Sequence, residues 1–549
     1  MDEQGDLTNL YVTNVSRGGS SGCREKRIEW YYNASDNTYY LFMPSYSNMT
    51  KLRLGLEGTD HIYLDGNRIA YQDQFSLTTG DHIVTVENGE QYALKVMESE
   101  NLPAIFIDTE SGSLVNVHEN KENSEKGDTF IMNKAGEPMY FGELDGFKVH
   151  GNIGLDESGG EGSETPHEEF VENNKLSYQM KLSKKANLFD MGEARKWLLI
   201  SNTEDYSLMR NYITYNMAKA AGVDFVTDTQ YVDLYINGVY RGNYLLTEKV
   251  EVGENRVNIT DLGKNNENAN KDTDLSKLEV VNPTDGEIVE TEPGTAKWVD
   301  IPKDPLDITG GYLMELDTAG RYWPEPSGFV TSRNQAVVVK NPEYASEAEI
   351  DYIRRRYQEF EDALYAEDGV NPETGFAYYE YCDVDSFAKK YLVEEICGNL
   401  DANITSQNIY KYSDTVDIRL KAGPVWDYDR AWGNFGEIYG FNYADFEGLT
   451  AMQPITAGSV WYGLYQHPEY YTVMVEHYYK DFHPYLDSII QGGFNEVRDM
   501  IETSAVMDKI RWGLHGTTDQ EEMKEVFEYH TDMLDDFIRH RVEYLDTQW

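Results

Sequence analysis

The sequence predicts an α+β protein in which a small β-sandwich precedes a larger body that is strand-rich at first and helical in its C-terminal part. Between Ile28 and Met97, short apolar runs alternate with Gly, Asn and Asp turn signals about every 8–12 residues. Residues 102–250 continue with strand-like runs around one helical segment, and beyond residue 346 apolar residues recur at helical spacing. A chain of 549 residues is long enough for several domains.

The N-terminal 100 residues divide into a tether and a module. Residues 1–25 contain GGSSG and predict a flexible segment. Residues 26–100 predict a small, Ig-like β-sandwich, with a hairpin turn at Glu87–Gly89. Because His, Cys and carboxylate side chains do not cluster in it, we interpret this module as a spacer or binding domain.

The body that follows, residues 101–549, begins with the strand-like run PAIFIDTESG. Apolar residues at helical spacing predict a helix between Asn202 and Gly222. Residues 231–250 predict two strands around Asn237-Gly238, a dipeptide that accepts the positive φ angles of a tight hairpin.

The second half of the body combines an insertion with helices. Residues 263–304 are rich in Asn, Asp, Glu and Pro, which predicts a surface insertion. Ser346 and Glu349 form a capping box that opens a helix, within a helical part of about 346–549. His530 lies on the apolar stripe of the last helix, and we interpret it as a structural histidine.

The charge balance narrows the possible partners. The chain carries 97 acidic and 47 basic residues, a net charge of −50, so its surface repels nucleic acid and anionic lipid. Cys23, Cys382 and Cys397 form no CxxC pair, which argues against a disulfide framework or a zinc site. No apolar run is long enough to predict a transmembrane segment. The sequence specifies no oligomeric state.

The same composition bears on location. Strong acidity, 42 tyrosines and few cysteines suit a surface-exposed protein. We therefore expect an extracellular or cell-surface protein whose export signal has been trimmed from this chain, with the spore coat or the cytoplasm as alternatives.

The most informative stretch runs from Asn399 to Asn434. Asp401 and Asn408 precede a predicted strand pair, which delivers Asp427 and Asp429 into a Gly-terminated turn. Phosphoryl transfer needs one carboxylate to orient a hydroxyl and accept its proton, and an amide oxygen with another carboxylate to hold magnesium.

Two other interpretations of these acids stay open. Asp401 can cap a helix, and Asp427 and Asp429 can be ordinary turn residues. Trp426 and Trp432 surround the acids, and an aromatic-lined acidic cleft is equally suited to hold a sugar.

Many colinear segments carry a family resemblance, among them VHGNIGL, KLSYQMKLSKKANLFDMGEARKWLLISN, YVDLYINGVYRGNYLLTEKVEVGENRVNI, DITGGYLMELD and GPVWDYDRAWGN. Through them the chain from about Leu102 to Asn434 resembles the spore-coat CotH family of atypical protein kinases. The resemblance implies a divergent bilobal kinase-like fold that binds ATP between its lobes, with magnesium or, alternatively, manganese.

The resemblance also implies roles for individual residues. Asp401 resembles the catalytic Asp, Asn408 a magnesium-coordinating amide, and Asp427 the metal-binding Asp, with Asp429 as its substitute. Lys181 lies where a phosphate-clamping Lys is expected, although a surface Lys on a strand is the alternative.

Two further positions are implied nearer the nucleotide. Glu248 falls where the strand leads into the interlobe hinge, where its backbone would contact adenine. Arg210 and Asn211 lie in a helix from which they would either bridge towards the phosphates or hold the helix in place.

The chain departs from the family pattern in three places. His150 precedes Gly151-Asn152 where relatives often have Arg, so an imidazole largely neutral at pH 7 replaces a permanent charge and weakens any contact with phosphate. The Gly-rich stretch 157–164 carries three glutamates and predicts an insertion rather than a phosphate loop. The Asp401-to-Asn408 spacing is also longer than the step of about five residues in ordinary kinases.

Together these observations predict an ATP- and magnesium-dependent kinase that phosphorylates Ser or Thr of secreted, surface or coat-type proteins. Its acidity favours a basic, Ser/Thr-rich protein substrate. The alternatives are a catalytically silent kinase-like module that serves surface attachment or assembly, and a carbohydrate-binding surface protein.

Overall fold

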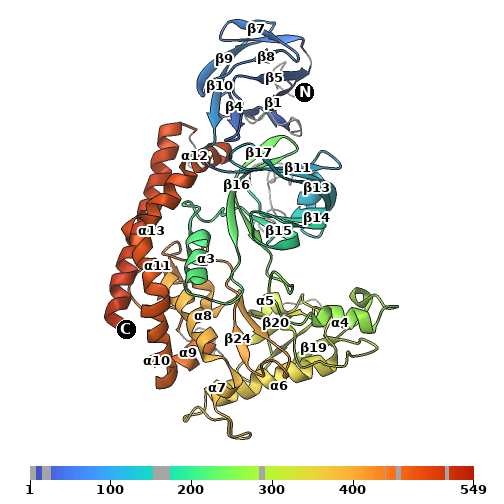
Figure 1. Ribbon diagram of the computed structural model, residues 1–549, viewed down its shortest axis with the longest axis vertical. Helices are drawn as coiled ribbons and strands as arrows, with labels where there is room; N and C mark the ends of the chain where they lie inside the picture. Colours follow the sequence, from blue (N-terminus) through green and yellow to red (C-terminus); the bar gives the residue numbers. More distant parts are fainter. Residues whose placement is uncertain are drawn as a thin grey trace. The chain divides into compact units, whose positions relative to one another are not determined.

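The computed structural model describes residues 8–14, 26–57, 59–151, 174–282, 291–438, 441–452, 459–513 and 518–549. They belong to two compact units (Figure 1). Unit 1 comprises residues 1–208, 229–248 and 495–531, and unit 2 comprises residues 209–228, 249–494 and 532–549. The many strands and the helical C-terminal part confirm the mixed α+β class, whereas the kinase-like bilobal arrangement stays a prediction.

The N-terminal module consists of two sheets, with strand orders β2-β1-β5-β8 and β3-β4-β10-β9-β6-β7, that share one core. Its strands are β1 (Thr8–Asn14), β2 (Lys26–Glu29), β3 (Tyr31–Asn33), β4 (Thr38–Met43), β5 (Leu52–Glu57), β6 (His61–Leu64), β7 (Asn67–Ala70), β8 (Gln74–Phe75), β9 (Gly80–Thr85) and β10 (Gln91–Glu98). The predicted hairpin joins β9 and β10. Residues 8–14 lie within the predicted flexible segment but form β1, because alternating Leu10 and Val12 enter the core.

The second part of unit 1 is a closed barrel with strand order β11-β12-β13-β14-β15-β17-β16. Its strands are β11 (Ala104–Thr109), β12 (Glu125–Met132), β13 (Pro138–Val149), β14 (Tyr178–Asn187), β15 (Glu193–Ile200), β16 (Thr229–Ile236) and β17 (Val239–Glu248). The hairpin at Asn237 and Gly238 is confirmed, with φ angles of 52° and 86°. Parallel pairing of β11 with β16 closes the barrel around apolar side chains, beside the short helix α1 (Val115–Glu119).

The module and the barrel share apolar packing. The Phe42 and Tyr240 ring centroids lie 4.9 Å apart, and the Tyr46 and Phe106 ring centroids lie 6.5 Å apart. The Glu29 backbone N–H also donates to the Gly238 carbonyl at 2.9 Å. The N-terminal module is therefore continuous with the core of unit 1.

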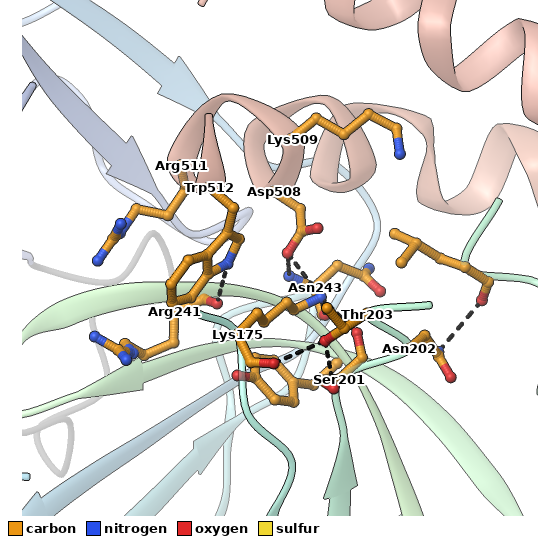
Figure 2. A network of polar contacts seen from close by, with 12 residues as sticks. Lys175, Ser201, Asn202, Thr203, Arg241, Asn243, Asp508, Lys509, Arg511 and Trp512 are labelled. Atoms are coloured by element: carbon orange, nitrogen blue, oxygen red, sulfur yellow. Dashed lines mark hydrogen bonds and ion pairs between the residues drawn. The ribbon is translucent and has the colours of Figure 1, made fainter. Parts of the chain in front are cut away.

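Helix α12 (Phe494–Trp512) is fixed to the barrel by a buried polar network (Figure 2). The Lys175 ammonium donates to the carbonyls of Ser201 and Asn243 at 2.7 and 2.6 Å, and it pairs with Asp508 of α12 at 2.8 Å. Burial lowers the pKa of Lys175, while the Asp508 carboxylate opposes that change. Lys509 adds a bond to the Tyr206 carbonyl at 2.6 Å.

Unit 2 is built on a seven-stranded sheet with strand order β18-β19-β21-β22-β20-β23-β24. Its strands are β18 (Val280–Val281), β19 (Ala296–Val299), β20 (Tyr312–Asp317), β21 (Gly328–Val330), β22 (Ala336–Asn341), β23 (Gln407–Lys411) and β24 (Leu420–Ala422), and a small separate ribbon joins β25 (Glu437–Ile438) to β26 (Phe441–Asn442). The predicted insertion, 263–304, contributes β18 and β19, because Ala296 and Val299 are buried in the sheet. Residues 283–290 of it lie outside the described residues.

The remaining helices are α3 (Arg210–Ala220), α4 (Leu262–Ala269), α5 (Ala319–Tyr322), α6 (Glu347–Leu364), α7 (Tyr378–Tyr381), α8 (Val384–Cys397), α9 (Val460–Tyr465), α10 (Pro468–His477), α11 (His483–Ser488) and α13 (Gln520–Gln548). The capping box of α6 is confirmed: Ser346 Oγ accepts from the Glu349 N–H, and Glu349 accepts from the Ser346 N–H. Helix α8 packs against both α3 and α10 (Figure 1).

The remaining sequence predictions concern single residues and membrane spans. Cys382 and Cys397 are buried free thiols, whereas Cys23 and the Gly-rich stretch 157–164 lie outside the described residues. His530 stacks on Tyr206 at 4.9 Å, as suits a structural histidine. Among the described helices, none combines the length and apolar character needed to cross a membrane.

Candidate active site

Asp401 lies where helix α8 gives way to the seven-stranded sheet of unit 2. Gly398 ends the helix in the left-handed conformation, with φ 57°, which glycine adopts without a Cβ clash. A 3₁₀ turn, Leu400–Asn403, follows, and the Asn399 side chain caps it by accepting the Asp401 N–H at 3.1 Å. The turn holds the Asp401 backbone in place.

The surroundings of Asp401 favour its neutral form. Burial, and after it the negative charge of Asp427, raises the pKa of Asp401 to about 7. The guanidinium groups of Arg430 and Arg321 act in the opposite direction. The structure thus brings Asp401 and Asp427 close enough for their charges to repel each other.

Asn408 lies on the first strand of the pair that the sequence predicted, and Asp427 follows the second strand. Asn408 lies on β23, is only 5% exposed, and its amide nitrogen donates to the Pro424 carbonyl at 3.3 Å. Asp427 follows β24 with φ 70°, and its backbone N–H donates to the Tyr215 hydroxyl at 3.3 Å. A non-glycine residue in this conformation carries backbone strain, which recurs at functional sites.

The donor set formed by Asn408 and Asp427 fits magnesium in its chemistry. A carboxylate and an amide oxygen are hard oxygen ligands of the kind that this ion prefers. The pKa of Asp401 supports the fit, because a cation beside Asp427 would relieve the repulsion that raises it. In the described part of the chain, no three His, Cys, Asp or Glu side chains gather as a ready metal cluster. A magnesium site here therefore depends on Asn408 and on phosphate oxygens for its other ligands.

Arg210 and Asn211 hold the loop that contains Asp427 and Asp429. The Arg210 Nε donates to the Ala431 carbonyl at 3.0 Å, and Asn211 Oδ1 accepts the Tyr428 N–H at 2.8 Å. Both residues thus make structural contacts, in line with the alternative that they hold their helix in place. A contact of Arg210 with nucleotide stays a prediction.

The two other predicted nucleotide ligands belong to unit 1. Lys181 lies on β14 opposite Lys196 of β15. Glu248 is the last residue of β17 and is 7% exposed. His150, the departure from the family pattern, is half-buried, and its N–H donates to the Ser177 carbonyl at 2.9 Å.

Sequence reasoning missed Arg321, whose charge acts on Asp401, and the two acids Glu315 and Asp317 on β20. Arg321 donates to the Thr405 hydroxyl at 2.6 Å, and that hydroxyl donates to Asp317 at 2.9 Å. Burial and the Asp317 charge raise the pKa of Glu315, which pairs with Asn408 across the sheet, to about 7. Acids at alternate positions of the apolar strand YLMELD were the signal that could have revealed this pair.

The sequence was compared with known proteins. A protein family described as CotH kinase protein matches residues 148–545 of the chain. No curated protein matches it. The matched region contains Asp401, Asn408, Asp427 and Lys181, and it leaves out the N-terminal sandwich.

Proposed function

The chain belongs to the CotH kinase protein family, and on that premise we propose that it is an ATP- and magnesium-dependent kinase that phosphorylates Ser or Thr of other proteins. One observation carries the proposal: two carboxylates, Asp401 and Asp427, lie close enough to repel each other, and Asn408 is buried on the strand that follows Asp401. Two carboxylates close enough to repel each other suit a divalent cation and its phosphate ligands.

Each residue then has a distinct task. Asp401 orients the substrate hydroxyl and accepts its proton as the oxygen bonds to the γ-phosphorus atom, while the bond from that atom to the β,γ-bridging oxygen breaks and ADP leaves. Asp427 and Asn408 would hold magnesium, with Asp429 as the alternative ligand, and the ion would neutralise charge on the phosphate oxygens. Manganese offers the same coordination chemistry.

The protonation of Asp401 must change for it to act as a base. With a pKa of about 7, a large share of Asp401 is protonated at neutral pH. A cation held by Asp427 would cancel the repulsion between the two carboxylates and lower the pKa of Asp401. Nucleotide binding therefore prepares the base for the proton that it must accept.

Lys181, Glu248 and Arg210 are the proposed nucleotide contacts. Lys181 would place its point charge on the α- and β-phosphates, and the Glu248 backbone would contact adenine. The net charge of −50 favours basic substrates, and secreted, surface or coat-type proteins are the proposed class. An extracellular or cell-surface location follows as part of the same proposal.

A catalytically silent module is the second candidate, and His150 favours it. Where relatives often have an arginine, a largely neutral imidazole provides no permanent charge for phosphate. In that case the kinase-like body would serve surface attachment or assembly.

One experiment separates these functions. The protein is incubated with labelled ATP and magnesium, alone and with a basic, Ser/Thr-rich protein, and phosphate transfer is followed by intact-mass measurement. Transfer is expected in the wild type, is lost in Asp401→Asn, and is kept in Asp272→Asn, which neutralises an exposed acid elsewhere in unit 2. A wild type that neither binds ATP nor transfers phosphate with magnesium or manganese supports the silent module.

A further inference from the structure

A buried carboxylate on helix α8 contacts both loops of the candidate site. Glu394 is 0% exposed and forms an ion pair with Lys390, one helical turn earlier. Its Oε1 accepts the Tyr428 hydroxyl at 2.6 Å, and its Oε2 accepts the Asn399 amide at 2.7 Å. One carboxylate thus bonds with both of its oxygens to two separate segments of the chain.

The two segments are those that carry the acids of the site. Asn399 caps the turn of Asp401 through the bond to the Asp401 N–H. Tyr428 stands between Asp427 and Asp429 in the sequence, and the Lys390 ammonium also donates to its hydroxyl at 3.2 Å. Glu394 therefore connects the proposed base with the proposed metal ligands through one residue on each side.

Stability alone is a poor reason for this pair. Removing two charges from water costs as much as their attraction returns, so a buried ion pair often stabilises no better than apolar side chains of the same shape. A carboxylate does offer two acceptor oxygens on one rigid group, which neither an apolar side chain nor a glutamine offers. The carboxylate of the buried ion pair therefore contributes two acceptor positions at a fixed distance from each other.

We propose that Glu394 is a positioning residue that fixes the Asp401 turn and the Asp427–Asp429 loop relative to each other. The catalytic consequence rests on the proposed kinase function. The structural connection does not, because it is formed by the chain itself. The proposed base and the proposed metal ligands would then both be held by the same side chain. Loss of Glu394 would loosen the Asp401 turn and the Asp427–Asp429 loop together.

The next residue provides a matched control. Glu395 is also 0% exposed, pairs with Arg541 at 2.7 Å, and accepts the backbone N–H groups of Thr450 and Ala451 at 2.7 and 3.0 Å. It is as deeply buried as Glu394 and equally engaged. Its side chain bonds to residues 450, 451 and 541, and the carbonyls of 450 and 451 accept the Asn403 side-chain amide at 3.4 and 2.7 Å. Glu395 is therefore a control for the loop 427–431.

The test is amide hydrogen exchange of the full chain without nucleotide, read by mass spectrometry. In Glu394→Gln combined with Lys390→Met, which leaves no unpaired buried charge, exchange is expected to accelerate about tenfold or more in both 399–403 and 427–431. In Glu395→Gln the segment 427–431 should keep its wild-type exchange. Acceleration in only one segment or in neither segment of the double variant, or equal acceleration of 427–431 in the Glu395 variant, overturns the proposal.

Two milder variants keep the test decisive if the double variant fails to fold. Asn399→Ala should loosen only 399–403, and Tyr428→Phe, which removes one hydroxyl, should loosen only 427–431. Loosening of the opposite segment by either variant contradicts the connection through Glu394.

Kinetics provide a second readout. Asn399→Ala is expected to lower kcat about tenfold with unchanged ATP affinity, whereas Tyr428→Phe should weaken magnesium-dependent ATP binding about tenfold. Equal effects of both variants on kcat and on ATP affinity would contradict the separate roles of the Asn399 and Tyr428 contacts. A wild type without phosphate transfer refutes the proposed function, and the hydrogen exchange result still decides the role of Glu394.

Discussion

Asp401→Asn should make the protein less active and, above neutral pH, more stable. Burial and the Asp427 charge raise the pKa of Asp401 from its ordinary 3.8 to about 7. An acid with a higher pKa in the folded than in the unfolded state binds its proton more tightly when folded. The contribution of this group to the free energy of unfolding is therefore greatest below about pH 4, where it is protonated in both states. The contribution is lost as the pH rises to about 7.

The size of the effect follows from the same values. At about 1.4 kcal/mol for each pH unit, keeping Asp401 ionised costs the folded state up to about 4 kcal/mol above pH 7. Asn has no charge to ionise, although its amide must also be buried, which reduces the gain to about 1–3 kcal/mol. About 2 kcal/mol of the difference between the two proteins should develop between pH 5.5 and pH 8.

Urea unfolding followed by tryptophan fluorescence measures this difference, at pH 5.5 and pH 8 with EDTA present to remove divalent ions. Phosphate transfer by the same variant should fall by about 10²–10⁴, with nucleotide affinity nearly kept, because the proposed task of Asp401 is to accept a proton. A stability difference that does not change with pH would refute the electrostatic reasoning. Full activity in the variant would refute the role as base.

Three further predictions concern the other parts of the chain. Asp427→Asn, which removes charge but little volume, should abolish thermal stabilisation by magnesium and ATP while the fold is kept; unchanged stabilisation would exclude Asp427 from the metal site. Lys181→Met should weaken ATP binding, measured by calorimetry, about tenfold. Lys184→Met, a change of an exposed lysine on the same strand, should leave ATP binding unchanged. Equal ATP affinities of the two variants would contradict the contact between Lys181 and phosphate. Phe42→Ala should cost about 3–5 kcal/mol in urea unfolding, because its ring packs on Tyr240 of the barrel, and a loss below about 1 kcal/mol would show that module and barrel are independent.

Sequence reasoning succeeded where the signal is local. The capping pair Ser346 and Glu349 and the turn dipeptide Asn237-Gly238 each act within a few residues, so their structures could be predicted directly. The closed barrel could not, because its closing pair joins Ala104 to Asp233. No short-range pattern specifies which distant strands will pair.

The candidate site divides in the same way. Asp401, Asn408 and Asp427 lie within one stretch, and the family resemblance of that stretch predicted their roles together. Glu394 and Arg321 escaped notice because, in the sequence, they look like ordinary charged residues of a helix and a turn. Their importance arises from burial and from partners that only the folded chain brings to them.

The buried polar network between α12 and the barrel has a consequence for how the chain folds during synthesis. Tyr206 leaves the ribosome long before Lys509, its partner 303 residues later. At about 5–20 residues per second, this delay lasts about 15 to 60 s. Until α12 emerges, Lys175 has no Asp508 to pair with, and Tyr240 and Phe106 lack part of their apolar cover. Until then the barrel is an incomplete intermediate that exposes apolar surface, and a chain that ended before residue 495 would lack this cover permanently.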